Sequence, residues 1–451
     1  MERTDVAIVG AGYAGLCAAR RLRAAGLGVA VLEASGRVGG RTRTERLTGG
    51  WAVDLGGQWM SAGHTRFAAL AEAYGSAAFP TPSEGADLFV TASSRRRHTR
   101  SVPPLAPHAL AALGLAAWRL DRLSRRVDPE RPWDAPGADR LDSVTVATWL
   151  RRALPVPRAR RFSELLLGEE LCVEVAGVSL LALLTAVRAA GGVRAGAEDE
   201  SGARLLVEGA DAPALSIAAE LGGDLRLDAP VTAIHHTDDG VRLTGPAGTV
   251  EARRAIVAVP PPLAGRIAYD PPMPAVRDHL TQRTPMGSVL KLAAAYERPF
   301  WRDDGLSGRA LSMDGPIPMA FDVSRPDGPG LLCALVPGRA AQRLADLPAS
   351  ERRERAVAEL VRWYGPRAAE PIAWHEAMWA DDPHCRGGYA AYFPPGVLTS
   401  VGRALREPVG AIHWAGTETA TRFAGHIEGA IRSGEHAADE VLTTLGTRVV
   451  G

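Results

Sequence analysis

Lysine is almost absent from this chain. Of its 52 lysine and arginine residues, 51 are arginines, and Lys291 is the single lysine. A genome that disfavours lysine codons explains this bias wherever either cation suffices. Lys291 persists either by chance or because arginine fails there, since an ammonium is compact and titratable whereas a guanidinium is planar and permanently charged.

Other absences exclude whole classes of protein. The net charge of +1 argues against a nucleic-acid binder, which carries a basic excess. The four cysteines are scattered, with no CxxC pair, which predicts neither a disulfide framework nor a metal site and is typical of a reducing cytoplasm. Apolar runs stop short of the roughly 18 residues of a spanning helix. Neither terminus suggests a signal peptide or anchor, so we expect a soluble, cytoplasmic protein.

The N-terminus has the order of a dinucleotide-binding unit. A strand, a G-x-G-x-x-G turn, a helix and a second strand are predicted at residues 5–9, 10–15, 16–25 and 29–32. Glycines allow the backbone to approach a pyrophosphate at the helix N-terminus, and Glu33 stands where a carboxylate takes ribose hydroxyls. The alternative is a glycine-rich turn in an unrelated sheet. The candidate cofactor residues here are Gly10, Gly12, Ala14, Gly15, Glu33 and Ala34.

Two glycine-rich segments follow, GRVGGRTRT at 36–44 and VDLGGQW at 53–59. Arg41 and Arg43 can offer charge to a pyrophosphate, although a solvated basic loop is the alternative. Both segments resemble those of the FAD-dependent amine oxidases. The resemblance implies that the glycines pass under the isoalloxazine ring and that Trp59 faces the substrate, unless it is a core residue. It adds to the cofactor set Arg37, Gly40, Arg41, Arg43, Gly56, Gly57, Gln58 and Trp59.

The middle of the chain is less informative. The arginine-rich run at 95–100 is typical of a solvated hairpin edge. Helical sequence is predicted at 105–123, 144–154 and 158–190, a β-meander at 225–227, 231–234 and 241–243, and a buried strand at 255–259. The resemblance implies that Val231 lies on the adenine side of FAD and that this part of the chain returns to the FAD domain.

Lys291 lies in strand-like sequence between two leucines. Such a lysine either points to solvent or points inward, where it must be paired or hydrated. The GSVLK segment at 287–291 is similar to the family pattern, which implies that this lysine holds a water against flavin N5. An ammonium there would stabilise the anionic reduced flavin and superoxide.

The C-terminal part carries the strongest resemblance. The segments at 386–396, WAGTETAT at 414–421 and GxxEGAxxSG at 425–434 are similar to those of the monoamine oxidases, and the resemblance runs in patches from residue 5 to about 442. It implies further cofactor contacts from Trp379, Gly416, Thr417, Glu418 and Ile427. It also implies a substrate site of Trp59, Cys172, Tyr389 and His426, and catalytic roles for Lys291, Tyr389, His426 and Trp379.

Two positions depart from the family pattern. Gly388 stands where the mammalian-type enzymes have the cysteine that bonds to the flavin, and Cys385 lies three residues too early, so we predict non-covalent FAD as in a bacterial-type enzyme. His426 stands where the second aromatic ring of the amine cage is expected. It can form a ring wall, but it adds a titratable donor; the alternative is a histidine with no substrate role.

The resemblance implies an α/β fold with a discontinuous Rossmann-like FAD domain at 1–78, 204–284 and 385–451, and a substrate domain of mixed sheet and helices at 79–203 and 285–384. It implies oxidation of an amine C–N bond to an imine, which hydrolyses to an aldehyde or ketone, with O₂ reduced to H₂O₂ and a homodimer as the assembly. One alternative is an L-amino-acid oxidase, with Arg66 or Arg194 clamping a carboxylate. A desaturase or dehydrogenase that tailors a natural product and a non-catalytic flavin binder are the others.

Overall fold

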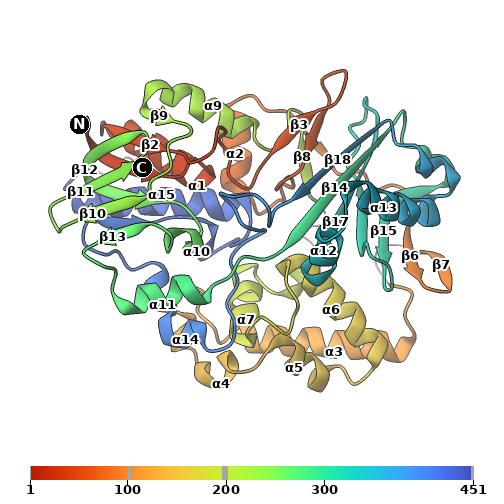
Figure 1. Ribbon diagram of the computed structural model, residues 1–451. Coiled ribbons are helices and arrows are strands. Elements are labelled where there is room, and N and C mark those ends of the chain that lie inside the picture. Colours follow the sequence, from red (N-terminus) through yellow and green to blue (C-terminus); the bar gives the residue numbers. More distant parts are fainter. Residues whose placement is uncertain (1, 99–102, 196–201, 448–451) are drawn as a thin grey trace.

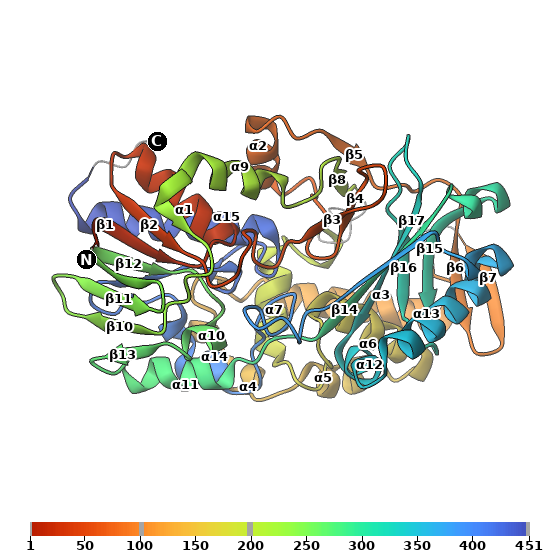
Figure 2. The ribbon, with the colours of Figure 1, turned by 45° about the horizontal axis from the view of Figure 1, so that its top comes forward.

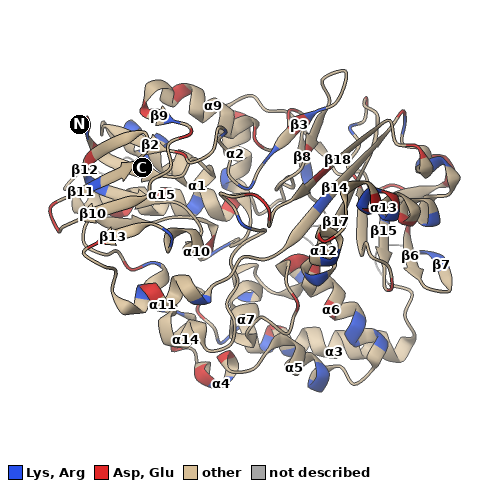
Figure 3. Ribbon diagram, viewed as in Figure 1, with Lys and Arg blue, Asp and Glu red and all other residues tan. Residues whose placement is uncertain are grey.

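The computed structural model describes residues 2–98, 103–195 and 202–447. Two β-sheets lie side by side, one at the left and one at the right of Figure 1, and a layer of helices lies beneath the second sheet. Basic and acidic residues are interspersed over both halves (Figure 3), so neither half carries one sign of charge. Thr99 and Arg100 of the predicted basic run lie outside the described residues.

The first sheet is built around a parallel pair that starts at the N-terminus. β1 (Glu2–Val9) pairs in parallel with β2 (Val29–Leu32) on one side and with β12 (Gly248–Val257) on the other. The full order is β13 (Ala268–Asp270), β10 (Ala233–His236), β11 (Val241–Gly245), β12, β1, β2 and β9 (Leu225–Arg226), with β19 (Ile412–Trp414) on β12. The ends of β1 and β2 carry their chains into the glycine-rich segments.

Two helices from opposite ends of the chain cover this sheet. α1 (Tyr13–Ala24) and α15 (Ile427–Thr444) contact each other over β1 and β2, with α9 (Ala212–Leu221) beside them, as Figure 2 shows. Their apolar faces share one core with the strands, to which Ile8, Leu16 and Val441 contribute. The start of α1 packs against the middle of α15, since a Cβ on Gly434 would lie 2.0 Å from the Ala14 carbonyl oxygen.

The second sheet is a mixed sheet whose two faces have different partners. Its order is β18 (Ala373–Met378), β14 (Val289–Tyr296), β17 (Gly330–Pro337), β16 (Met319–Asp322), β15 (Leu306–Ser312), β6 (Ala86–Thr91) and β7 (Ser94–His98). Leu290 and Leu292 face α12 (Gly338–Ala345) and α13 (Ala349–Tyr364). Because strand side chains alternate, Lys291 faces the other side, where the helical layer lies.

That helical layer contains α3 (Pro107–Ser124), α4 (Ala138–Asp142), α5 (Val146–Ala153), α6 (Pro157–Leu171) and α7 (Leu180–Ala189). Two small sheets join the halves, β3 (Thr44–Arg46) with β4 (Ala52–Asp54), and β5 (Ala78–Pro80) with β8 (Arg204–Leu206). The remaining helices are α2 (Thr65–Ala73), α10 (Pro261–Ala264), α11 (Ala275–Arg283) and α14 (Val397–Val401).

The sequence pattern was wrong in two places. The predicted meander begins with residues 225–227, but β9 pairs with β2 at the opposite edge of the sheet, and the meander is β10, β11 and β12. The predicted helix at 158–190 is two helices, because Cys172 adopts a left-handed backbone with φ of 51° and ends α6. Strands of the first sheet come from the segments that we assigned to the FAD domain, although the domain boundaries themselves stay a prediction.

Candidate active site

A cavity of about 1220 Å³ runs between the two sheets and is lined by both. We call one end the cofactor end, which includes Gly12, Glu33, Arg41, Thr417 and Glu418. We call the other the substrate end, which includes Trp59, Lys291, Arg309, Phe321, Tyr389 and His426. Within the described residues, no helix has the length and apolarity to cross a membrane, and no three His, Cys, Asp or Glu side chains gather at metal-binding distance.

The turn at the cofactor end requires glycine because of its backbone conformation and its close packing. Gly10 has a φ of +99°, a conformation that favours glycine. A Cβ on Gly15 would lie 1.9 Å from the Gly10 carbonyl oxygen, so Gly15 packs α1 against the turn and does not line the cavity. Gly12 lines the cavity and is the N-cap of α1 without a side-chain cap, so the first amides of the helix are left for a ligand.

The Glu33 carboxylate braces this turn. One oxygen accepts a hydrogen bond from the Ala11 amide at 2.6 Å, and the other accepts from the amide and hydroxyl of Ser35, both at 2.9 Å. Glu33 is buried at the end of β2 and lines the cavity. It is therefore fixed where a ribose hydroxyl could reach its remaining lone pairs.

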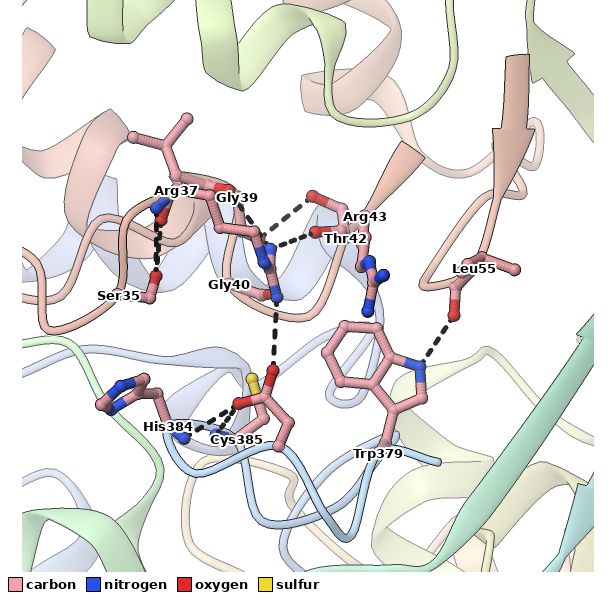
Figure 4. Close-up of polar contacts among 12 residues, drawn as sticks. Ser35, Arg37, Gly39, Gly40, Thr42, Arg43, Leu55, Trp379, His384 and Cys385 are labelled. Carbon is pink, nitrogen blue, oxygen red and sulfur yellow. Dashed lines mark hydrogen bonds and ion pairs between the residues drawn. The ribbon is translucent and has the colours of Figure 1, made fainter. Parts of the chain in front are cut away.

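Arg37 holds the next loop together instead of pointing into open solvent. Its guanidinium donates to the carbonyls of Gly40 and Thr42, both at 2.9 Å, and lies 5.9 Å from the Trp379 ring centroid (Figure 4). Trp379 in turn donates from Nε1 to the Leu55 carbonyl at 2.7 Å. Arg37 and Trp379 thus tie two glycine-rich segments to the same wall of the cavity.

Arg41 forms a buried ion pair with Glu418 across the cofactor end. Two N–H groups of Arg41 meet the two carboxylate oxygens at 2.6 and 3.1 Å, and Nη1 also donates to the Tyr389 carbonyl at 2.8 Å. Burial raises the pKa of Glu418, but the Arg41 charge and hydrogen bonds outweigh it and bring the pKa below its ordinary value. Arg41 therefore joins the WAGTET segment to the substrate end, with both charges already compensated.

The cofactor end closes with the turn before α15. Gly416 has a φ of +129°, and the Thr417 hydroxyl accepts from the Gly425 amide at 2.7 Å and donates to the His426 carbonyl at 3.0 Å. Ile427 begins α15, and a Cβ on Gly57 would lie 3.5 Å from its side chain. No side chain caps α15, so its N-terminal amides also face the cavity.

The cavity therefore fits FAD. Two uncapped helix N-termini supply positive dipole ends for a pyrophosphate and for the electron-rich edge of a flavin ring. Glycines line the walls where a planar ring needs close backbone approach, among them Gly12, Gly40, Gly56 and Gly57. Val231 also lines the cavity, and its place on the adenine side stays a prediction.

Lys291 is buried at the substrate end and donates hydrogen bonds to two protein acceptors. Nζ donates to the Gln58 Oε1 at 2.6 Å and to the Gly56 carbonyl at 2.8 Å, and lies 5.6 Å from the Trp59 ring centroid. Burial lowers its pKa, an effect that Cys333 and Asp54 partly oppose. An ammonium has three donors, so one remains for a water or ligand in the cavity that Lys291 lines.

Tyr389 and His426 lie on neighbouring segments of the same wall. A Cβ on Gly425 would lie 3.9 Å from the Ala390 Cβ, so the chain segments that carry His426 and Tyr389 pass close to each other. The Tyr389 hydroxyl donates to the Glu169 Oε1 at 3.2 Å. Burial, with Cys172 and Glu169 nearby, raises the pKa of Tyr389 well above its ordinary value, so the hydroxyl stays neutral.

The His426 ring lies in a small aromatic cluster. It is 5.3 Å from the His64 ring and 6.3 Å from the Phe423 ring, both edge to face, and Nδ1 contacts the Ala424 carbonyl at 3.2 Å. His426 and Tyr389 both line the cavity, which supports the ring-wall interpretation of His426 over a histidine with no substrate role.

Some predicted residues lie elsewhere. Arg43 pairs with Glu45 and does not line the cavity, because its side chain leaves the loop on the opposite side from Arg41. Cys172 contacts Tyr389 from behind and does not line the cavity either. Arg66 pairs with Glu435 at 3.4 Å, and neither it nor Arg194 lines the cavity, so neither is a carboxylate clamp.

The sequence reasoning also missed lining residues, namely His64, Glu169, Arg309, Phe321 and Phe423. Phe321 could have been found from strand alternation, since Met319 lies two residues away on the same face of β16. Arg309 lies in a register shift of β15, so alternation alone does not give the direction of its side chain. His64, Glu169 and Phe423 lie at turns and helix ends, where no sequence period indicates direction.

Gly388 lines the cavity and carries no sulfur for a flavin bond. Cys385 also lines the cavity, but burial, with Asp382 nearby, raises the pKa of its thiol to about 12. It is therefore a poor nucleophile at neutral pH. Both observations support the prediction of non-covalent FAD.

Comparison with known proteins identifies the family of the chain. The model of the flavin containing amine oxidoreductase family matches residues 13–442. A protein named as a flavin-containing monoamine oxidase of Mycobacterium tuberculosis is 38% identical, covering 98% of this chain and 97% of its own. An L-amino acid dehydrogenase of Synechocystis is 37% identical, covering 98% of this chain and 95% of its own.

The fold has solved counterparts. Wild-type putrescine oxidase bound to putrescine has a TM-score of 0.93 and 34% identity, covering 98% of this chain and 99% of that chain. This confirms the predicted α/β fold, the FAD cofactor and the amine-oxidising class. The chain belongs to the family of flavin-containing amine oxidoreductases.

Proposed function

We propose that this chain oxidises a small amine at its substrate end and passes the electrons to molecular oxygen. Two electrons and two protons leave the amine to give an imine, which water hydrolyses to an aldehyde or ketone, and O₂ takes up the electrons and protons as H₂O₂. The single observation that carries this proposal is the buried ammonium of Lys291, held by Gly56 and Gln58 in the cavity wall.

The side chains of the substrate end suit a neutral amine. FAD, when bound, supplies the two-electron acceptor. Tyr389 and His426 offer ring faces on adjacent segments of the wall, between which an amine can lie. The Lys291 charge disfavours a second cation nearby, so it favours the deprotonated amine, whose lone pair assists oxidation of the neighbouring carbon.

Lys291 also explains the choice of acceptor. Reduction of O₂ builds negative charge, and a positive charge fixed in a water-poor cavity stabilises that charge without reorganisation. The third N–H of Lys291 is the donor available for this purpose. An arginine would carry the charge but could not take the same compact position between two acceptors.

The test is rapid kinetics on Lys291→Met. Anaerobic bleaching of the flavin by an amine should persist, whereas its return with O₂ should slow about tenfold or more, which is a loss of roughly 1.4 kcal/mol of transition-state stabilisation. Lys291→Arg separates the need for charge from the need for an ammonium. Unchanged reoxidation in Lys291→Met would remove Lys291 from the oxygen reaction.

An amino-acid substrate is the second candidate, because one relative is named as an L-amino acid dehydrogenase. The two arginines that we expected to clamp an α-carboxylate do not line the cavity. A screen for H₂O₂ with amines and L-amino acids decides between them, and dye reduction without H₂O₂ would indicate a dehydrogenase. The cytoplasmic location and the homodimer stay predictions.

A further inference from the structure

At the substrate end of the cavity, one half-buried guanidinium has no oppositely charged side-chain partner among the described residues. Arg309 on β15 lines the cavity, half-buried, and its group lies 5.7 Å from the Phe321 ring centroid. Over the described part of the chain, its side chain has neither a hydrogen bond nor an ion pair. Of the other arginines that line the cavity, Arg37, Arg41 and Arg406 donate to protein acceptors, and Arg266 is exposed beside α10. Arg309 therefore has donors to offer a ligand.

The position of Arg309 follows from the sheet. Lys291, Leu335, Met319 and Leu311 lie opposite one another in register on β14, β17, β16 and β15. Arg309 lies in a register shift of β15 just before Leu311, and its guanidinium lies over the Phe321 ring on the face that lines the cavity. Its strand is three strands away from that of Lys291, which places the two backbones about 14 Å apart at a strand spacing of about 4.8 Å.

The wall between these two cations is apolar. Leu335, Met319 and Leu311 form its floor, and Trp59 and Phe321 stand edge to face, 5.4 Å apart. A methylene chain laid along this wall would remove apolar area from water. The Arg309 guanidinium lies over the Phe321 ring, a cation–π contact that uses none of its N–H donors.

We propose that Arg309 forms an anion subsite, and that the preferred substrates are amines that carry a carboxylate at the far end of an alkyl chain. This inference rests on the proposed function for the amine end. A guanidinium binds a carboxylate through two parallel N–H···O hydrogen bonds, and no neutral residue in this wall offers the same pair of donors. In an α-amino acid the two groups are bonded to one carbon, so it is too short to reach both Arg309 and the amine site.

Acidic residues in the same cavity are the argument for a diamine substrate. Asp87, Glu169 and Glu170 all line it. Asp87 already accepts a hydrogen bond from the Ser307 hydroxyl and Glu169 one from Tyr389, and Glu170 is exposed, whereas Arg309 is half-buried with its donors not engaged. The contacts of Arg309 therefore favour an anionic group on the substrate, and a diamine is included in the experiment below as the competing substrate.

The first measurement does not depend on turnover. Octanoate, which has the carboxylate but no amine, should raise the thermal unfolding temperature of the wild-type holoenzyme and should not raise that of Arg309→Gln. Arg343→Gln is the matched control, because Arg343 is an exposed arginine on α12 outside the cavity and its loss removes the same charge. Equal shifts in wild type and Arg309→Gln would overturn the subsite.

The second measurement compares substrates by anaerobic bleaching of the flavin, which needs no O₂. Arg309→Gln should raise the concentration of ω-aminooctanoate that half-saturates the bleaching rate about tenfold, the value of one charge-assisted hydrogen bond, and leave that of octylamine within about twofold. An equal loss for both, or a wild-type preference for octane diamine or L-norleucine, would overturn the proposal. If no amine bleaches the flavin, the proposed function fails, and the octanoate shift still decides the subsite.

Discussion

The two ends of the cavity treat charge in opposite ways. At the cofactor end, Arg37 is held by backbone carbonyls and Arg41 by Glu418, so these cations are compensated before any ligand arrives. At the substrate end, Lys291 keeps one N–H and Arg309 keeps all of its own for the cavity. Charges that are paired within the protein hold the binding site in place and stabilise the fold. Charges without a protein partner are available to assist the reaction and to select the substrate.

Because of this difference, we expect substitutions at the two ends of the cavity to affect different properties, stability at one end and activity at the other. A buried ion pair is costly to break because the remaining charge has no solvent, whereas a lone cation in a cavity wall can be neutralised with little loss of fold. Substitutions at the cofactor end should therefore reduce the free energy of unfolding and FAD content together. Substitutions at the substrate end should change rates and leave the fold intact.

The largest effect is expected for Arg41→Ala. It leaves the Glu418 carboxylate, which is 1% exposed, without its cation, and should lower the free energy of unfolding by about 3–5 kcal/mol. FAD content should fall with it, because Gly416 to Glu418 line the cofactor end. Urea unfolding followed by circular dichroism and the flavin absorbance of the purified protein measure the two losses.

Arg43→Ala is the control two residues away. Arg43 pairs with Glu45, with side chains 42% and 30% exposed, so its loss should cost less than about 1 kcal/mol and spare the FAD content. Similar losses for both variants would mean that the loop as a whole, and not the buried pair, organises the cofactor end.

The cofactor end was the more predictable of the two from sequence. Its geometry is local, since the Gly10 turn, α1 and Glu33 follow one another within one β–α–β unit. Even there the pattern could not tell Arg41 from Arg43, because the direction of a loop side chain depends on Glu418, hundreds of residues away. The place of Arg309 in the cavity could not be predicted from sequence, because Phe321 and Leu335 on the same wall come from other strands. The register between two strands cannot be read from the sequence of one strand alone.

A medium effect is expected for glycines within one turn. Gly15→Ala places a Cβ 1.9 Å from the Gly10 carbonyl oxygen, so the turn must move, at a cost of about 1–3 kcal/mol in the free energy of unfolding. Gly12→Ala meets no atom closer than 3.8 Å and should keep the fold, but its methyl group lies in the cavity and should weaken FAD binding.

Thermal unfolding of the FAD-free proteins and titration with FAD separate these two glycines. If Gly12→Ala lost as much stability as Gly15→Ala and bound FAD normally, the turn would serve packing alone, and the assignment of Gly12 to the cofactor would be wrong.

The smallest effect expected is a pH dependence that distinguishes the ends. The Arg41 charge holds the pKa of Glu418 below its ordinary value, so this pair stays ionised through neutral and alkaline pH. Burial lowers the pKa of Lys291, so its ammonium loses its proton at a lower pH than an exposed lysine does. The charged form dominates below that pKa, and the rate of reoxidation by O₂ should therefore fall as the pH rises through it, by at most the factor lost in Lys291→Met.

Stopped-flow reoxidation of the reduced enzyme from neutral to alkaline pH measures this decrease in rate, the alkaline limb of the pH profile. Lys291→Met should show no such limb, and Lys291→Arg, if it reacts with O₂, should show none either because arginine does not titrate there. A limb that survives in both variants would assign the titration to another group and leave Lys291 as a structural cation.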